Sequence, residues 1–214
     1  MAEIKVLGIC GSPRKGATEH ALQYALRIME EKGAITNQVN LRKLKVHSCI
    51  HCDRCIKENT GRCMVFADDG DELVAQWESA TTYLIASPVY SMGITPEIVN
   101  FISRLRPMRN RQIQQKEIQL PKVGSCITVG GTRHGGQETS AEIINNLYIS
   151  RGILVCGGGG AYNAGTVWSK DQLEKNLLDD EEGMKTIRTI ALRLMSAAKL
   201  LQDGFESNNK ELLE

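Results

Sequence analysis

Four of the seven cysteines lie within fifteen residues of one another. Cys49, Cys52 and Cys55 are each separated by two residues, and Cys63 follows after seven more, a stretch that contains Gly61. Three thiolates at this spacing can bind three corners of one cubane, and a short loop with a glycine can bring the fourth. The spacing therefore predicts a 4Fe-4S cluster held by these four cysteines.

Zinc is the alternative metal for four cysteines, although zinc sequences usually place about a dozen or more residues between two C-x2-C pairs. His51 could compete as a ligand, but four cysteines complete the shell of either metal, so we expect His51 near the cluster or on the surface. Cys10, Cys126 and Cys156 stand alone in apolar runs and are predicted core residues. In a reducing compartment this distribution indicates metal binding rather than disulfides.

A second candidate site begins with the sequence GSPRKGAT over residues 11–18, between an apolar run and a helical pattern. Free N–H groups at a helix start, together with Ser12, Arg14 and Thr18, suit a phosphate. The loop nearly matches the nucleotide-triphosphate pattern, but Ala17 stands where that pattern requires lysine. The dinucleotide pattern is absent as well, so a monophosphate such as FMN fits better than either.

Two further loops follow apolar runs and could flank a flat ring. One is SPVYSMG over 87–93, and the other is GGTRHGGQE over 130–138. Their glycines allow backbone N–H groups to approach ring heteroatoms, while Tyr90 and Met92 offer polarizable surface. His134 lies in the third loop, but we expect no catalytic side chain, because the redox chemistry belongs to the cofactors.

The order of elements explains how these loops could meet. Apolar runs at 4–10, 35–41, 81–86, 123–129 and 153–156 predict five strands, and helical periodicity lies between them and over 184–201. Such alternation predicts a doubly wound parallel α/β sheet with helices on both faces, and ligands at the carboxyl ends of its strands. We expect one domain over 1–206, with an inserted cysteine segment at 45–71 and a tail over 207–214.

Composition excludes several classes of protein. Lys plus Arg is 26 and Asp plus Glu is 25, so the net charge of +1 argues against nucleic-acid and anionic-membrane partners. The sequence has no apolar run long enough for a membrane span and no signal-peptide pattern at its start, so we expect a cytoplasmic protein. Arg104, Arg106, Arg109 and Arg111 could dock an acidic ferredoxin or a nucleotide phosphate, but a solvated helix end is the simpler interpretation.

The three loops resemble those of the flavodoxin-like NADPH-dependent FMN reductase superfamily, over roughly residues 1–200. The resemblance implies FMN, with the first loop on its phosphate and the other two around the isoalloxazine. Relatives often carry Asn-Thr at the start of the first helix where this chain has Thr18-Glu19, and Glu19 is left out of the site because its carboxylate would repel phosphate. The predicted FMN residues are Ser12, Arg14, Gly16, Thr18, Pro88, Val89, Tyr90, Met92, Gly93, Gly130, Gly131, Arg133, Gly135 and Gly136.

With the cysteine segment included, the chain resembles the iron-sulfur flavoproteins, whose cluster segment has a slightly shorter last gap. This resemblance implies an electron-transfer flavoprotein that takes electrons from ferredoxin through the cluster to FMN, and on to oxygen, peroxide, a quinone or another small acceptor. It also implies homodimers or homotetramers, with the cluster of one subunit near the FMN of its neighbour. Two alternatives stay open at this point: an NAD(P)H-dependent FMN or quinone reductase with structural zinc, and a zinc-stabilised binding module without flavin.

Overall fold

The computed structural model of the protein describes residues 3–108, 121–159, 162–170 and 179–212. At its centre is a parallel sheet with the order β2-β1-β3-β4-β5, in which β6 also pairs with β4. The strands are β1 (Lys5–Cys10), β2 (Ile35–Asn40), β3 (Thr82–Pro88), β4 (Val123–Gly130), β5 (Leu154–Val155) and β6 (Gly165–Trp168). This order is that of flavodoxin-like folds, so the predicted doubly wound α/β class is confirmed.

The fifth position of the sheet is shared by two short strands. Leu154 of β5 pairs with Val123 near the start of β4, whereas Gly165 of β6 pairs with Ile127 nearer its end. We predicted one strand over 153–156 and did not predict β6, which brings the strands of this sheet within the described residues to six. The run of glycines after β5 does not favour a longer strand. In the sequence of β6 only two adjacent residues, Val167 and Trp168, are large and apolar, which is too short a run to predict a strand.

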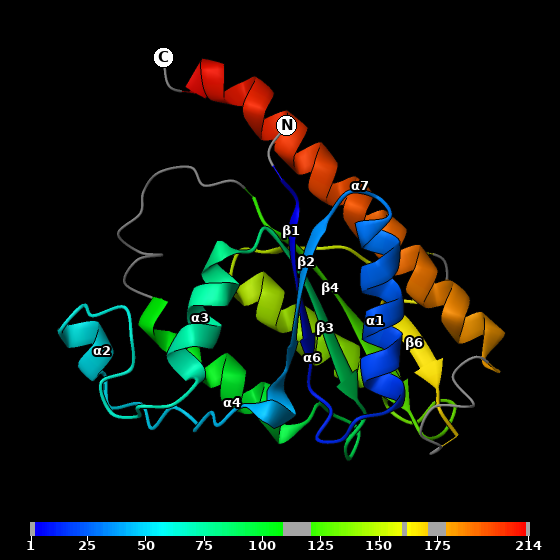
Figure 1. The fold of residues 1–214 in the computed structure, drawn as a ribbon, viewed down its shortest axis with the longest axis horizontal. Helices are drawn as coiled ribbons and strands as arrows, with labels where there is room; N and C mark the ends of the chain where they lie inside the picture. The colour runs from blue at the N-terminus through cyan, green and yellow to red at the C-terminus, as the bar shows by residue number, and fades with distance from the viewer. Residues whose placement is uncertain (1–2, 109–120, 160–161, 171–178, 213–214) are drawn as a thin grey trace.

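Helices cover both faces of the sheet (Figure 1). On one face α1 (Ala17–Glu30) and α7 (Glu181–Leu212) share a core with Val6 and Leu84. On the other face α3 (Gly70–Ser79), α4 (Pro96–Arg104) and α6 (Gln137–Ser150) share a core with Leu7 and Tyr83. Side chains of successive strand residues point to opposite faces of the sheet, and helices cover both faces. Successive residues of a strand are therefore buried in different cores.

The cysteine segment lies on the side of the molecule away from α1 and α7, beyond α3 and α4 (Figure 1). It contains α2 (Arg54–Lys57) and is preceded by the short helix η1 (Leu41–Lys43), while η2 (Arg106–Met108) follows α4. Helix α7 continues past Ser207, where we expected the tail to begin.

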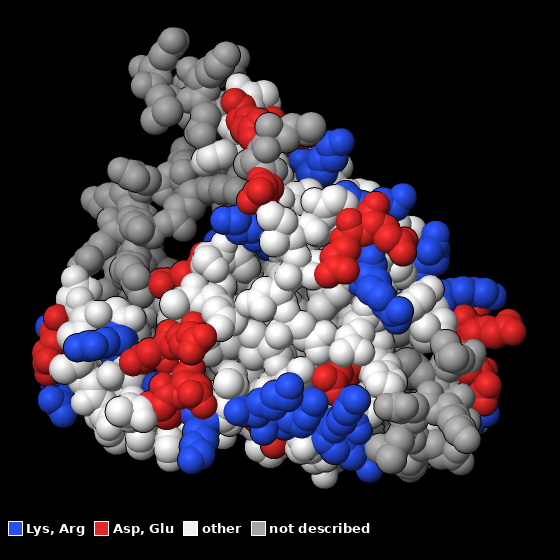
Figure 2. Space-filling model, in the orientation of Figure 1, with Lys and Arg blue, Asp and Glu red and all other residues white. Residues whose placement is uncertain are grey.

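Surface charge is mixed on the face drawn in Figure 2, where Lys and Arg side chains lie among Asp and Glu side chains around a broad uncharged area. This distribution fits the net charge of +1. Among the described helices, none combines the length and the apolar character that a membrane span requires.

Candidate cofactor sites

The three predicted FMN loops follow β1, β3 and β4 and meet at one edge of the sheet. The Gly11 N–H donates to the Ala86 carbonyl at 2.8 Å, and the Val89 N–H donates to the Val129 carbonyl at 2.9 Å. The hydroxyl of Thr95 is buried and donates to the Gly11 carbonyl at 2.7 Å. The sheet thus brings these loops together, although their sequences are far apart.

The first loop presents the start of α1 without a side-chain cap. The N-cap residue is Gly16, which has no side chain to cap the N–H groups of the first turn. Those N–H groups can therefore bind an anion. The Ser12 hydroxyl donates to the Arg14 carbonyl at 2.7 Å and accepts the Arg14 N–H at 3.3 Å, which fixes the loop. Ser12 and Thr18 are buried, whereas Arg14 is exposed.

Glu19 follows the first loop, and its charge is balanced by Arg42, an arginine that the sequence analysis did not single out. Arg42 of η1 contacts the Glu19 carboxylate, with Nη2 to Oε2 at 2.9 Å. Both side chains are largely buried. The pair therefore removes the repulsion that a free carboxylate in the first turn of α1 would exert on a phosphate.

The loop after β3 forms a tight turn that exposes apolar surface. Tyr90 and Gly93 exchange two backbone hydrogen bonds at 2.9 and 2.8 Å, and between them Ser91 and Met92 have φ values of 46° and 66°. Two positive φ values in succession are typical of a type I′ turn. Tyr90 is 46% exposed and Met92 is 55% exposed, so the turn offers a surface that a flat ring could cover.

Gly136 lies where the loop after β4 touches this turn. Its φ is +103°, and a Cβ atom there would lie 2.8 Å from the Met92 Cα and 3.2 Å from the Val89 Cγ1. Both the backbone conformation and the contact favour glycine. Pro88 and Val89 are partly buried beside this contact.

Gln137 fixes the loop after β4, a role that the sequence did not signal. Its buried amide accepts the Gly135 N–H and donates to the Thr132 carbonyl, both at 2.7 Å. On the other side of the loop, the indole N–H of Trp168 donates to the Gly131 carbonyl at 2.8 Å. These bonds hold the backbone of the predicted ring-binding glycines in one conformation.

Arg133 was predicted to contact the cofactor, and in the structure its side chain contacts two residues of the same chain, Trp168 and Asp180. The guanidinium lies 4.6 Å from the centroid of the Trp168 ring and 3.6 Å from Oδ1 of Asp180. The side chain is still 56% exposed. The neighbouring residue His134 has a φ of 54° and lines a small cavity with Trp168.

All four predicted cluster cysteines line a single small cavity of the cysteine segment. They share it with the apolar side chains of Ile50, Met64, Val65, Phe66 and Pro107. Cys55 is buried, Cys52 is exposed, and the other two lie between these extremes. The pKa of the Cys55 thiol is raised first by burial and then by the charges of the other three cysteines, which places the four sulfurs within electrostatic reach of one another.

The backbone around the cysteines turns toward their sulfurs. The His51 N–H donates to Cys49 Sγ and the Phe66 N–H donates to Cys63 Sγ, each at 3.4 Å. His51 and Asp53 have left-handed φ values of 56° and 58°, which wind the chain between successive cysteines. N–H donors of this kind stabilise anionic sulfur in iron-sulfur sites.

Helices α3 and α4 anchor the cysteine segment at both ends. The Cys49 N–H donates to Ser103 Oγ of α4, and the Cys63 N–H donates to Asp71 Oδ1 of α3, each at 2.9 Å. The bond from Cys49 joins residues 54 positions apart. The position of the segment is therefore set by the helices on this face of the sheet.

Arg104 is the buried centre of this anchor and is 2% exposed. Its Nη1 donates to both carboxylate oxygens of Asp68, at 2.8 and 2.7 Å. Asp68 also accepts the backbone N–H groups of His47 and Gly70. Burial alone would raise the pKa of Asp68, but the hydrogen bonds from Arg104 and His47 hold it well below its ordinary value.

The basic series at the end of α4 is not the solvated face that we expected. Arg104 is buried in its ion pair, and Arg106 bonds to Asp53 through Nε at 2.9 Å and through Nη2. This bond to Arg106 lowers the pKa of Asp53. Asp53 lies between two predicted ligands, so Arg106 brings a cation to the cysteine segment. Arg109 and Arg111 lie outside the described residues.

The donor chemistry of this segment fits an iron-sulfur cluster. Four thiols line one cavity with apolar walls, two of them accept backbone N–H groups, and two arginines stand beside them. The four cysteines share one cavity, but no three or more His, Cys, Asp or Glu side chains in the described part of the chain are arranged as a group that could hold a metal ion, so the fit concerns the type and number of donors. Cys10 and Cys126 lie in β1 and β4 as buried core residues, as predicted, and Cys156 is partly buried just after β5.

The sequence and the fold both match proteins of known class. Residues 4–166 match the NADPH-dependent FMN reductase family. An iron-sulfur flavoprotein of Methanocaldococcus jannaschii is 34% identical over 92% of this chain and 98% of its own length. An iron-sulfur flavoprotein of Archaeoglobus fulgidus is 37% identical over 88% of this chain and 94% of its own. The flavodoxin-like WrbA-like protein of Agrobacterium tumefaciens has the same fold, with a TM-score of 0.60 at 14% identity, over 92% of this chain and 98% of its own.

Fold and sites together define a flavin-dependent oxidoreductase with a flavodoxin-like sheet. Given the extent of the sequence match, the chain belongs to the iron-sulfur flavoproteins, within the NADPH-dependent FMN reductase family. The cofactors that we predicted, FMN and an iron-sulfur cluster, are those that these family names state.

Proposed function

We propose that the protein carries electrons from a one-electron donor, a reduced ferredoxin, through a 4Fe-4S cluster to FMN and on to a small acceptor such as oxygen, peroxide or a quinone. A cluster transfers one electron at a time and a flavin takes one or two, so this pair of cofactors joins the two kinds of carrier. The observation that carries the proposal is the placement of Cys49, Cys52, Cys55 and Cys63 around one cavity, in a chain with three loops suited to FMN.

The FMN phosphate would be bound by the first loop and the uncapped start of α1. Ser12, Arg14, Gly16 and Thr18 supply donors there, and Arg42 neutralises Glu19 nearby. The flavin ring would lie against the turn at Tyr90 and Met92 and the glycine loop after β4. That proposed set comprises Pro88, Val89, Tyr90, Met92, Gly93, Gly130, Gly131, Arg133, Gly135 and Gly136.

The chain's own residues would hold the cluster at the surface. Arg104 and Arg106 bring positive charge to the thiolates, and the apolar walls limit contact with water. Ile50 is 61% exposed and Val65 is 41% exposed beside the cysteines, so an apolar rim is available to a docking protein. The segment extends beyond α3 and α4, which suits transfer to a flavin in a neighbouring subunit of a homodimer or homotetramer (Figure 1).

Metal and flavin content of protein purified without oxygen tests the proposal. We expect about four iron, four sulfide and one flavin per chain. We also expect reduced ferredoxin to bleach the cluster absorbance before the flavin absorbance. Zinc in place of iron, with flavin present, would overturn the proposal in favour of an NAD(P)H-dependent reductase. Absence of flavin would overturn both the proposed electron-transfer function and the alternative of an NAD(P)H-dependent reductase.

A further inference from the structure

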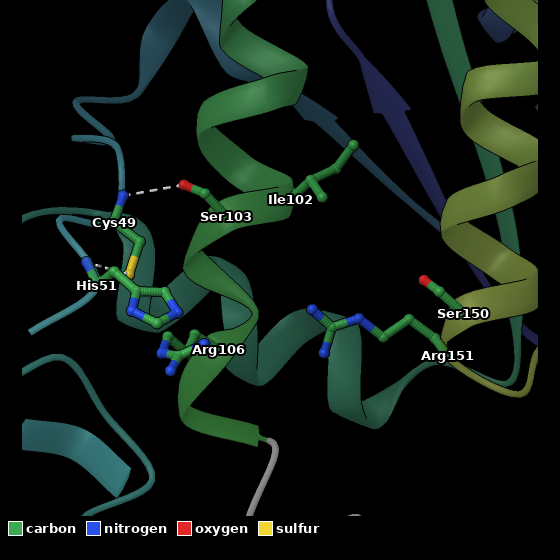
Figure 3. A pocket seen from close by; sticks show the side chains of 7 residues that line it. All are labelled: Cys49, His51, Ile102, Ser103, Arg106, Ser150 and Arg151. Atoms are coloured by element: carbon green, nitrogen blue, oxygen red, sulfur yellow. Dashed lines mark hydrogen bonds between the residues drawn. The ribbon is translucent and has the colours of Figure 1, made fainter. Parts of the chain in front are cut away.

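An open cavity of about 510 Å³ lies beside the cysteine segment, at the C-terminal ends of α4 and α6 (Figure 3). Its volume is within the range of pockets that hold cofactor-sized ligands, about 300–1,000 Å³. It is distinct from the FMN loops, which lie at the other end of α6. The lining residues are Cys49, His51, Ile102, Ser103, Arg106, Ser150 and Arg151.

The lining of this cavity is basic. It includes two arginines and a histidine, and the described residues that line it include no carboxylate. Figure 3 shows the Arg151 side chain extending from the end of α6 toward Arg106 and His51. Guanidinium groups of this kind can pair with a carboxylate or a phosphate.

Arg151 and Arg106 differ in how their charges are compensated by the described residues. Arg106 is paired with Asp53, whereas the Arg151 guanidinium donates from Nη1 to the neutral carbonyl of Leu105 at 3.2 Å. No carboxylate among the described residues forms an ion pair with Arg151. Burial lowers the pKa of Arg151, which reflects the cost of desolvating its guanidinium.

The cavity shares a wall with the cysteines. Cys49, Ser103 and Arg106 line both this cavity and the small cavity of the four cysteines. A ligand in the larger cavity would therefore lie next to the cluster and would change its electrostatic surroundings. Ile102 adds an apolar surface for the uncharged part of such a ligand.

We infer that this cavity binds a small organic anion, whose carboxylate or phosphate pairs with Arg151 and whose body packs on Ile102. The concave shape favours a small molecule over an acidic protein surface. The binding site rests on the arginine and the cavity alone, whereas its effect on the cluster rests on the function proposed above. Because the anion adds negative charge, it should bind more tightly when the cluster is oxidised, and it should lower the reduction potential of the cluster.

Calorimetric titration of the holoprotein with inorganic phosphate, citrate and ADP tests the inference. We expect citrate or ADP to bind more tightly than phosphate, and Arg151→Gln to weaken that binding by about tenfold or more. Arg27→Gln is the matched control, since Arg27 also lies near a helix C-terminus and donates to a carbonyl, at Gln23, but is exposed on α1. Ile102→Trp should weaken binding of ADP more than of phosphate, because it narrows the cavity without changing charge.

A redox titration gives the second readout. An anion concentration that just saturates the wild type should lower the potential of its cluster, by about 59 mV for tenfold tighter binding to the oxidised form, and should shift the potential of Arg151→Gln much less. The inference fails if none of the three probes binds, or if Arg151→Gln binds them as the wild type does. It also fails if Arg151→Gln slows only reduction by ferredoxin, which would make Arg151 a protein contact. Iron and flavin content of the same sample separates these failures from a failure of the proposed function.

Discussion

Arg104 and Asp68 form a buried ion pair that ties the cysteine segment to α4. Two hydrogen bonds of 2.7 and 2.8 Å join them, and the side chains are only 2% and 4% exposed. Nη1 of Arg104 also donates to the His47 carbonyl, and its guanidinium lies 5.8 Å from the centroid of the Phe66 ring. The pair therefore contacts the chain on both sides of the four cysteines.

Arg104→Leu should destabilise the protein and release the cysteine segment. Removing one partner of a buried ion pair typically costs about 3–5 kcal/mol, because the other charge stays buried. We expect that loss in urea unfolding, together with low iron content and retained flavin. Arg104→Lys should recover part of the iron, since it keeps the charge but not the two-oxygen contact. Iron content equal to the wild type in Arg104→Leu would contradict this role.

Acid should weaken the same pair. The pKa of Asp68 is lower in the folded protein than in the unfolded chain, so its contribution to stability is complete above its unfolded pKa, about 3.9, and is lost as the pH falls through the folded value. The difference in free energy of unfolding between the wild type and Asp68→Asn should therefore shrink below about pH 4. In an Arg104→Leu background, this pH dependence should largely disappear. A difference that stays constant below pH 4 would contradict this assignment.

The sequence predicts the sheet and the loops better than the contacts that fix them. Apolar runs such as 123–129 mark buried strands, and parallel strands must bring their carboxyl ends together, so the meeting of the three proposed FMN loops could be predicted without a structure. Cysteine spacing is a local signal, and it pointed to four cysteines that line one cavity in the structure. The sequence did not reveal the roles of three residues, Arg42, Arg104 and Gln137. Arg42 and Arg104 form ion pairs with residues that are distant in the sequence, and Gln137 fixes the conformation of a loop. Residue type alone predicts neither kind of contact.

Cys52→Ser should remove the cluster and leave the flavin. Cys52 lies in the segment beyond α3 and α4, far along the chain from the FMN loops, so the two sites should load independently. The visible spectrum should lose its broad iron-sulfur absorbance and keep the flavin bands. Cys156→Ser, which changes a partly buried cysteine outside the segment, serves as the control and should keep both. Loss of flavin together with iron in Cys52→Ser would show that the sites depend on each other.

Gly136→Ala should weaken FMN binding more than it weakens the fold. The new Cβ would meet the backbone of Met92 at 2.8 Å and push apart two loops of the proposed ring site. Gly33→Ala is the control, because Gly33 has a similar φ of +90° but no atom within 4 Å of the added Cβ. Both variants should lose about 1 kcal/mol of stability through backbone strain, and Gly136→Ala should lose more through the contact with Met92. Flavin fluorescence titration should show an affinity loss of about tenfold or more for Gly136→Ala only. Equal affinities in both variants would contradict a ring site at this contact.

Arg42→Gln should weaken FMN binding through Glu19 rather than through a lost contact to phosphate. Without Arg42, the largely buried Glu19 carboxylate stands unneutralised in the first turn of α1, where it repels an anion at the helix start. We expect the dissociation constant for FMN to rise by about tenfold or more, and riboflavin, which lacks the phosphate, to be affected much less. Adding Glu19→Gln should restore FMN binding, because it removes the repelling charge. If the double variant binds FMN as weakly as Arg42→Gln does, Arg42 contacts the phosphate directly. That result would contradict the proposal that Arg42 acts by neutralising Glu19.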